Sequence, residues 1–258
     1  MSFNTKQIKE IEEVIKRCLR NKFKNYKAKS NYMPFHTKLL GKDRMALYSF
    51  IQSLNTQFGT SIFEPVAVAL AHINFKTAKS QYAVGDHISQ EAQNVIQDII
   101  NSLSVNGDPN KVKEIELIRK VCNKGTLNSL KTVKVDLYIE NNKNEIFLFD
   151  LKTTKPNKSN FKDFKRTLLE WIAITFLSYP KAKVYSFLAI PYNPYYPNPY
   201  ENWTMKGMID IKNELKVGEE FWDFLGGNGA YEELLDCFER VGIEMRDEID
   251  EYFKKFKK

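Results

Sequence analysis

The sequence predicts an α/β fold, in which a β-sheet core is flanked by many helices. Residues 132–140 and 145–153 carry the apolar patterns of two strands, and the polar residues 141–144 between them suit a hairpin turn. Residues 160–179 then place apolar side chains at helical spacing, and residues 183–191 form a further apolar strand. A hairpin, a helix and a strand inside a helical wrapping make an α/β core.

Helices are expected on both sides of this core. Before the hairpin, helices are expected over residues 6–29, over residues 44–57, from near Glu64 onwards, over residues 89–103 and over residues 111–122. The first is basic and amphipathic, and Pro65 suits the first turn of the third. After the last strand comes a Pro/Tyr-rich loop, followed by helices that run through Phe224 and over residues 231–253.

We expect the whole chain, residues 1–258, to be a single domain in three parts. Residues 1–58 form a basic helical N-terminal part, residues 59–192 the α/β core that carries the candidate site, and residues 193–258 a C-terminal loop and helices. A content of 43% hydrophobic residues is enough to bury a core in one domain of this length.

Neither a membrane nor an oxidising compartment is indicated. The first residues lack the apolar segment of a signal peptide, and the apolar stretch at residues 171–177 falls far short of the roughly 20 residues of a membrane span. Cys18, Cys122 and Cys237 are isolated, so they predict neither a disulfide framework nor a metal site. A reducing, cytoplasmic location is expected.

Charge is distributed unevenly along the chain. Residues 1–44 hold 12 lysines and arginines against 4 acidic residues, whereas residues 201–258 hold 9 against 15. A basic N-terminal part beside a net charge of +7 suggests a polyanionic partner such as nucleic acid. We expect the helix over residues 6–29 to run beside DNA phosphates or to support an interface. A lysine-rich solvated surface is the alternative.

The end of the second strand carries the candidate chemistry. Asp150 and Lys152 are two residues apart, so their side chains share a face of the strand. Asp136 on the neighbouring strand is within cross-strand reach if the register places it opposite. The alternation of that strand puts four apolar residues on the other face: Val133, Val135, Leu137 and Ile139. Two carboxylates and the carbonyl of Leu151 would form an oxygen-rich Mg²⁺ site.

Such a site would support metal-assisted hydrolysis of a phosphodiester. Lys152 beside the cation would orient or deprotonate water and stabilise the charge that develops on phosphorus. Solvated cross-strand ion pairs are the alternative explanation for Asp150 and Lys152. The strands are too apolar for a solvated face, however, and the basic segment KPNKSNFKDFKR follows them directly.

These residues resemble a known nuclease signature. Val135-Asp136 followed by Asp150-Leu151-Lys152 is similar to the PD-(D/E)xK motif, with Val in place of the frequent Pro. Three stretches resemble type II restriction endonucleases of the TdeIII/MjaII kind: FGTSIFEPVAVALA, DLKTTKPNKSNFKDFKRTLLEWIA and VGEEFWDFLGG. The resemblance covers roughly residues 55 to 240. It implies a restriction-endonuclease-like mixed β-sheet and a Mg²⁺-dependent homodimer. Its substrate would be a short palindromic site in double-stranded DNA, of the GGNCC type.

The resemblance also implies roles for individual residues. Asp136 and Asp150, with Leu151, would bind the metal, and Lys152 would be the catalytic lysine. Glu64 would be an additional catalytic acid, although an acid at a helix start also simply favours the helix dipole, and Glu116 is a rival for the same role. The following residues would contact DNA, unless they belong to a solvated loop: Lys155, Asn157, Lys158 and Lys162.

Two other functions remain open at this stage. A DNA repair or recombination nuclease of the same fold would share the motif, because a fold does not fix a function. A DNA-binding protein without catalytic activity would be favoured if the two aspartates lay far apart. A dimer would use either the N-terminal helices or the C-terminal helices around Phe221, Trp222 and Phe238.

Overall fold

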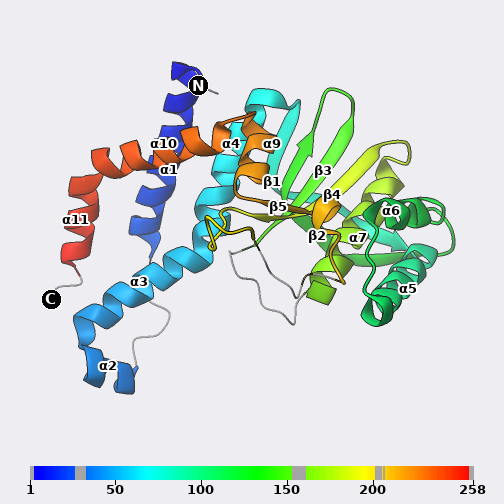
Figure 1. Cartoon of the computed structure of the whole chain (residues 1–258), viewed down its shortest axis with the longest axis horizontal. Coiled ribbons are helices and arrows are strands. Elements are labelled where there is room, and N and C mark those ends of the chain that lie inside the picture. The colour runs from blue at the N-terminus through cyan, green and yellow to red at the C-terminus, as the bar shows by residue number, and fades with distance from the viewer. Residues whose placement is uncertain (1–2, 27–32, 153–160, 201–204, 206, 256–258) are drawn as a thin grey trace.

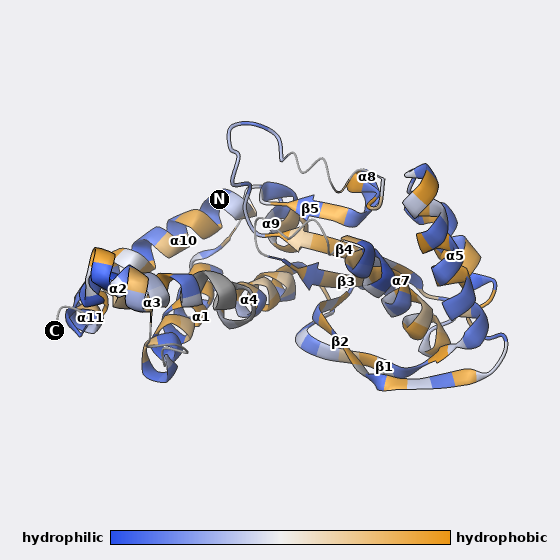
Figure 2. Ribbon diagram, turned by 90° about the horizontal axis from the view of Figure 1, so that it is seen from below, coloured by the Kyte–Doolittle hydropathy of each residue, from blue (hydrophilic) through white to orange (hydrophobic). Residues whose placement is uncertain are grey.

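A computed structural model of the chain describes residues 3–26, 33–152, 161–200, 205 and 207–255. These residues form a five-stranded sheet whose strands follow one another in chain order, as Figure 2 shows. The strands are β1 (Thr77–Ser89), β2 (Leu127–Glu140), β3 (Glu145–Leu151), β4 (Lys183–Ile190) and β5 (Leu215–Val217). The first three pair antiparallel and the last three parallel, so the sheet is mixed. The predicted α/β fold is confirmed.

Helices surround this sheet and extend away from it on one side. They are α1 (Thr5–Asn25), α2 (Pro34–Leu40), α3 (Lys42–Phe58), α4 (Glu64–Asn74), α5 (Gln90–Asn106), α6 (Lys111–Arg119), α7 (Phe161–Ser178), α8 (Ile211–Glu214), α9 (Glu219–Gly226), α10 (Ala230–Glu244) and α11 (Arg246–Lys254). A π-helix over Gly59–Phe63 leads into α4. Helices α5, α6 and α7 gather at one end of the molecule, and α1, α2, α3, α10 and α11 lie at the other (Figure 1).

Both faces of the sheet are covered, and β3 shows why. Its side chains alternate between two buried clusters, since successive residues of a strand point to opposite faces. Ile146 and Leu148 pack with α5, α6 and α7, in what we call the α7-side core. Phe147 and Phe149 pack with α1, α4, α9 and α10, in the α4-side core. A strand buried on both faces is apolar almost throughout, as this one is.

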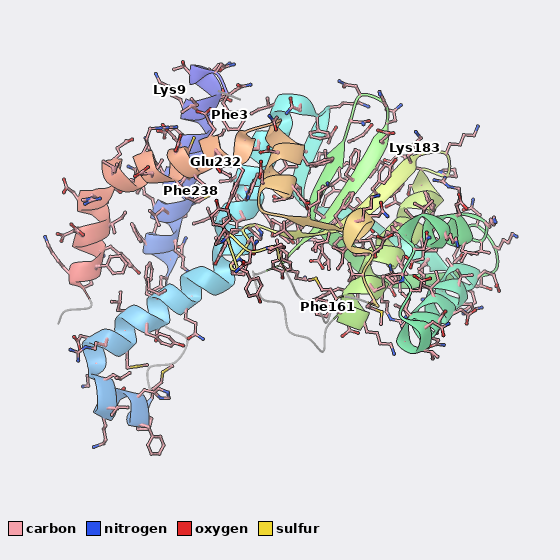
Figure 3. All side chains as sticks on the ribbon, in the orientation of Figure 1. Phe3, Lys9, Phe161, Lys183, Glu232 and Phe238 are labelled. Carbon is pink, nitrogen blue, oxygen red and sulfur yellow. The ribbon has the colours of Figure 1, made fainter. Side chains whose placement is uncertain are left out.

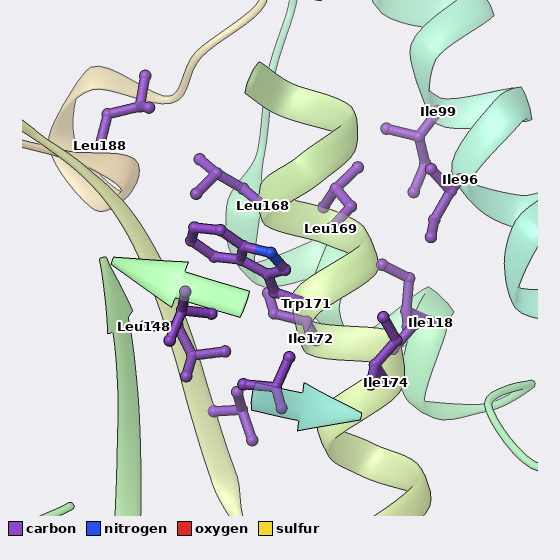
Figure 4. Close-up of a cluster of buried hydrophobic side chains, with 14 of the residues drawn as sticks. Ile96, Ile99, Ile118, Leu148, Leu168, Leu169, Trp171, Ile172, Ile174 and Leu188 are labelled. Atoms are coloured by element: carbon purple, nitrogen blue, oxygen red, sulfur yellow. The ribbon is translucent and has the colours of Figure 1, made fainter. Parts of the chain in front are cut away.

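Helix α7 supplies the largest share of one core. Its predicted apolar positions are buried or packed against the core, so the predicted helix is confirmed. Figure 4 shows α7 between the sheet and two further helices. The buried side chains drawn there include Leu148, Leu168, Leu169, Ile172, Leu188, Ile96, Ile99 and Ile118. Figure 3 places Phe161 at the start of α7 and Phe238 on α10, on opposite sides of the sheet.

The sequence prediction missed the edge strands and several boundaries. Strand β1 was not expected, because its residues Lys79, Ser80 and Gln81 are exposed and give it no continuous apolar run. Pairing with β1 extends β2 back to Leu127 instead of residue 132. Helix α2 and strand β5 were also missed, and β5 interrupts the helices predicted up to Phe224.

The predicted helix ends also shift. Helix α6 ends at Arg119, short of residue 122, and the predicted helix over residues 231–253 is interrupted at Met245, between α10 and α11. Helix α1 ends at Asn25, and residues 27–29 of its predicted range lie outside the described residues. In the part of the chain that the structure describes, no helix combines the length and hydropathy needed to cross a membrane.

The alternation predicted for β2 was wrong at one point. Leu137 and Ile139 belong to the α4-side core, as expected of residues that share a face. Val135, however, belongs to the α7-side core, together with the partly buried Val133. Strand β2 therefore changes face between Val135 and Leu137, and the residue at this change is Asp136.

The unequal charges of the two termini meet within the molecule. Lys16 and Arg20 of α1 each lie 2.6 Å from a glutamate of the C-terminal helices, Glu244 and Glu248 respectively. In the reverse direction, Arg240 of α10 lies 2.6 Å from Glu12. Part of the basic charge that suggested a DNA-binding helix is thus used in intramolecular ion pairs.

A second group of charges is buried between helices α6, α7 and α8. Lys165 is fully buried (0% exposed) and lies 2.6 Å from Glu114 and 2.5 Å from Glu214. Lys111 lies 2.5 Å from the other oxygen of Glu214. Each buried charge therefore has an opposite charge in contact, as buried charges require. The group fixes three helices to one another.

Lys165→Ala should lower the free energy of unfolding by about 3 to 5 kcal/mol, because it leaves two buried carboxylates with a single lysine between them. Denaturant titration measures this change. Lys162→Ala, an exposed change on the first turn of the same helix, should alter the same quantity by less than about 0.5 kcal/mol. Equal effects from the two changes would show that the buried group contributes no more than the helix surface.

Candidate active site

The candidate site lies where β2 and β3 part. The two strands pair from Glu140↔Ile146 as far as Leu137↔Phe149, and the described pairing stops there. Beyond that point, Asp150 and Leu151 pair only with β4, opposite Leu188 and Ala189. Asp136 and Asp150 are therefore the first residues past the last β2–β3 pair, one on each strand. The strand register brings the two predicted aspartates to the same opening.

Asp136 is held by hydrogen bonds from two strands. The backbone N–H of Leu151 donates to its Oδ2 at 2.9 Å. The side-chain amide of Gln81, on β1, donates to its Oδ1 at 3.2 Å. Both oxygens of the carboxylate accept, so its orientation is fixed in the middle of the three strands. The amide of Leu151 faces the site, and a metal-binding role for its carbonyl stays a prediction.

Asp150 and Lys152 form a close ion pair at the end of β3. Lys152 Nζ lies 2.5 Å from Asp150 Oδ1. Asp150 is 4% exposed, whereas the side chain of Lys152 is 29% exposed. The ammonium also lies 4.9 Å from the ring centroid of Phe164 on α7, within reach of a cation–π contact. The carboxylate is thus buried and the lysine reaches the surface.

Burial raises the pKa of Asp150 to about 6. Lys152 opposes this shift by favouring the charged form, and the neighbouring carboxylate of Asp136 adds to it. A raised pKa at an opening of the sheet, with a like charge beside it, is typical of functional sites. Lys152 therefore offsets only part of the energetic cost of burying the Asp150 carboxylate.

Glu64 joins the two aspartates from the first turn of α4. It is 2% exposed, and its two carboxylate oxygens accept from the Gln81 amide at 3.1 and 3.0 Å. Burial raises the pKa of Glu64 to about 7; the hydrogen bond from Gln81 lowers it and the charge of Asp136 raises it further. The opening thus collects three carboxylates and one lysine.

The predicted site residues divide into three groups. Glu64, Asp136, Asp150, Leu151 and Lys152 are brought together as described. Glu116 is exposed on α6, and its side chain makes none of the contacts that join these residues. Lys162 is exposed on the first turn of α7, while Lys155, Asn157 and Lys158 lie outside the described residues.

Gln81 is the site residue that sequence reasoning missed. It lies on the strand that was not predicted, and an exposed glutamine has no charge or metal-ligand spacing to mark it. The only signal was the polar stretch of residues 79–81 between apolar neighbours. Its importance appears only when β1 is placed beside Asp136.

Comparison with known proteins identifies the family of this chain. The model of the HinfI type II restriction endonuclease family matches residues 3–242. The chain belongs to this family. The match includes every residue of the opening, and it confirms the resemblance to type II restriction endonucleases and the prediction of an enzyme, because the members of this class are site-specific deoxyribonucleases.

Individual relatives carry the same description. The type II restriction enzyme HgiCII of Herpetosiphon aurantiacus is 28% identical over 221 residues, which cover 84% of this chain and 80% of the relative. The type II restriction enzyme HgiBI of the same organism is 28% identical over 84% of this chain and 79% of the relative. The type II restriction enzyme MjaII of Methanocaldococcus jannaschii is 29% identical over 76% of this chain and 55% of the relative.

The raised pKa values predict how stability depends on pH without divalent cations. The folded state binds the Glu64 proton more tightly than the unfolded state does, since its pKa rises from 4.5 to about 7. This contribution to stability is therefore fully present below about pH 4.5 and is lost as pH rises through 7. The free energy of unfolding of the unmodified chain should fall by on the order of 2 kcal/mol between pH 5 and 8. We expect the Glu64→Gln protein not to show this fall.

Denaturant midpoints across this pH range, in EDTA, measure the change. The exposed Glu116→Gln is the matched control and should keep the pH dependence of the unmodified chain. A Glu64→Gln protein with that same pH dependence would show that Glu64 does not titrate differently on folding.

Proposed function

We propose that this enzyme cuts both strands of DNA at a short palindromic site, with Asp136, Asp150, Lys152 and Glu64 as its catalytic residues. The observation that carries the proposal is the opening between β2 and β3, where the two aspartates lie side by side and Lys152 reaches the surface. Family membership favours this function over DNA repair or recombination. A site of the GGNCC type follows from the sequence resemblance alone.

We propose that the opening binds Mg²⁺ through two carboxylates and a backbone carbonyl, since no group of three or more acidic, histidine or cysteine side chains in the described part of the chain is arranged to hold a metal ion. Burial raises the pKa of Asp150 and the neighbouring Asp136 adds to the shift, while Lys152 pairs with Asp150. An oxygen-only set of ligands suits a hard cation. Asp136, Asp150 and the Leu151 carbonyl would hold it, with Glu64 behind them. When bound, the cation supplies Lewis acidity and an activated water.

Lys152 would act on the phosphate. Its ammonium is held by Asp150 and by the ring of Phe164, and it remains partly exposed. A fixed positive charge at the mouth of a buried site stabilises the negative charge that develops on the phosphate oxygens. The same group can orient the attacking water by donating a hydrogen bond. Asp150 keeps the ammonium in place for either role.

DNA would be contacted next to this opening. Lys162 is exposed at the start of α7, the helix that also carries Phe164 beneath Lys152. Lys155, Asn157 and Lys158 come between β3 and α7 in the sequence, so the chain passes from the catalytic strand to Lys162 through them. Cationic and amide side chains suit phosphate contacts and base readout respectively. The exposed lysines of α1 are a second candidate surface.

A homodimer would supply the two active sites that a double-strand break needs, since a palindrome presents two half-sites related by a two-fold axis. The C-terminal residues Phe221 and Trp222 do not form its interface, because both are buried in the α4-side core. Phe238 is partly buried against the same core. Of the two interfaces that the sequence left open, the C-terminal one is therefore not favoured by these aromatic residues.

Helices α2 and α3 offer a better surface. Within the described residues, α2 buries none of its side chains, and α3 is anchored through Phe50, whose ring lies 5.0 Å from that of Tyr252. The exposed apolar side chains of the two helices form what we call the α2–α3 patch: Phe35, Leu39, Leu40, Leu47, Tyr48 and Ile51. Exposed patches of apolar side chains mark protein–protein interaction sites.

The cellular location would be the cytoplasm, where the enzyme meets DNA. Cys18, Cys122 and Cys237 are all free and buried, which suits a reducing compartment.

Asp150→Ala and Lys152→Ala should each reduce plasmid cleavage in Mg²⁺ by about 100- to 1,000-fold or more, while the folded proteins still bind duplex DNA. Gel analysis of cleavage and a DNA-binding titration in Ca²⁺ measure the two effects. The exposed Asp98→Ala on α5 is the control and should cut normally. Discrete fragments support a restriction enzyme, whereas smearing or a shift without cutting would reject it.

The combined change Leu47→Glu and Ile51→Glu should convert a dimer into monomers, because it places four like charges in a two-fold interface. Sedimentation velocity of the protein with its DNA measures the mass. Leu235→Glu, a similarly exposed leucine on α10, is the control and should leave the dimer intact. An unmodified monomer that makes concerted double-strand breaks would contradict the dimer.

A further inference from the structure

We propose that Gln81 is a positioning residue that holds Glu64 and Asp136 together as one cation site. The inference deepens the proposed function and rests on it, because it assigns to Gln81 the task of preparing the carboxylates for a divalent cation. Gln81 does not touch the reacting atoms in this proposal. It acts through the two acids that its amide contacts.

The side-chain amide of Gln81 lies at the centre of the carboxylates. Its Nε2 lies 3.1 and 3.0 Å from the two oxygens of Glu64 and 3.2 Å from Oδ1 of Asp136. The two hydrogens of one amide group are therefore shared among three carboxylate oxygens. Glu64 comes from α4 and Asp136 from β2, so this single group joins a helix to the sheet. Without it, two like charges would face each other.

The backbone of β1 is distorted at this residue. Gln81 has a φ of +50°, in the left-handed region, although its neighbours Ser80 and Tyr82 pair regularly with Leu137 and Val135. Among the described residues, Asn144 in the hairpin turn is the one other residue besides glycine with a positive φ. Such conformations are strained and persist where surrounding contacts compensate for them. Here the compensating contacts are the hydrogen bonds to the acids.

The residue opposite this distortion is Asp136. Strand β2 changes face at Asp136, between Val135 in one core and Leu137 in the other. Both strands of the pair thus depart from regular alternation at the same level, and both departures direct a side chain to the same opening. Two coupled departures from regular structure at one place point to a function of that place.

The chemistry of glutamine suits this task better than that of a charged residue. A lysine in its place would hold the acids but would neutralise them and compete with the cation. An asparagine is one methylene shorter and would not span both acids. The amide donates hydrogen bonds and adds no charge, so it keeps the carboxylates together and leaves their negative charge available.

Gln81→Met tests the proposal, since it keeps the length of the side chain and removes its donors. The probe is Mn²⁺, whose affinity is measured by calorimetry without DNA, and Mg²⁺-dependent cleavage is measured separately. We expect Mn²⁺ affinity to fall about 10-fold or more, the usual effect of losing a partner that orients metal ligands. Ser80→Ala, an exposed change on the same strand, should leave the affinity unchanged.

A double-mutant cycle with Glu64→Gln separates positioning from general damage. If Gln81 acts through Glu64, the Gln81→Met change should weaken Mn²⁺ binding less in the Glu64→Gln background than in the unmodified chain. Gln81→Asn tolerates the left-handed backbone and should show the same loss, which provides a second variant if Gln81→Met fails to fold.

Two results would overturn the proposal. One is Mn²⁺ affinity unchanged in both Gln81 variants, and the other is an equal loss with and without Glu64. Failure of the proposed function has a different signature: an unmodified protein that binds Mn²⁺ but leaves DNA uncut would refute it, while the cycle would still report on Gln81.

Discussion

The gathering of three carboxylates, two of them buried, is the constraint on which the rest of this site depends. Glu64, Asp136 and Asp150 are gathered into one opening, and a single lysine neutralises part of their charge. Burial is the main cause of the raised pKa values of Glu64 and Asp150, and the charge of Asp136 adds to both shifts. Such an arrangement is unfavourable for folding, and in the proposed function a bound cation would offset its cost. The surrounding structure must therefore hold the acids together.

That support comes from the two cores on either side of the sheet. Phe149 in the α4-side core and Leu148 in the α7-side core fix β3 from both faces immediately before Asp150. Beyond Phe149, β3 remains paired only with β4, which leaves one side of Asp150 open towards Asp136. A rigid sheet with a local opening positions charged groups more accurately than a loop does.

Charges elsewhere in the molecule are treated differently. The buried group around Lys165 pairs every charge and joins three helices. The ion pairs between α1 and the C-terminal helices are exposed on at least one side and contribute less to stability. In contrast to these groups, the opening between β2 and β3 gathers three carboxylates and one lysine, which leaves an excess of negative charge. This contrast, more than the presence of acids, distinguishes the candidate active site from the structural charge clusters.

The sequence by itself determined the strand that carries Asp150 and Lys152. The run from Phe147 to Phe149 marks a buried strand, and Asp150 and Lys152 stand out because charges rarely follow such a run without a partner. Local pattern is sufficient here, because the apolar period and the charges lie within a few residues. The helix α7 was predictable for the same reason.

Only the tertiary structure decided which other groups complete the site and which surfaces stay exposed. Gln81 lies on an edge strand with no apolar period, and its role depends on pairing with residues more than 50 positions away. Phe221 and Phe35 look equally apolar in the sequence, yet one is buried and the other is 85% exposed. The physical reason is that burial and register are set by long-range packing, whereas residue spacing reports only on the local backbone.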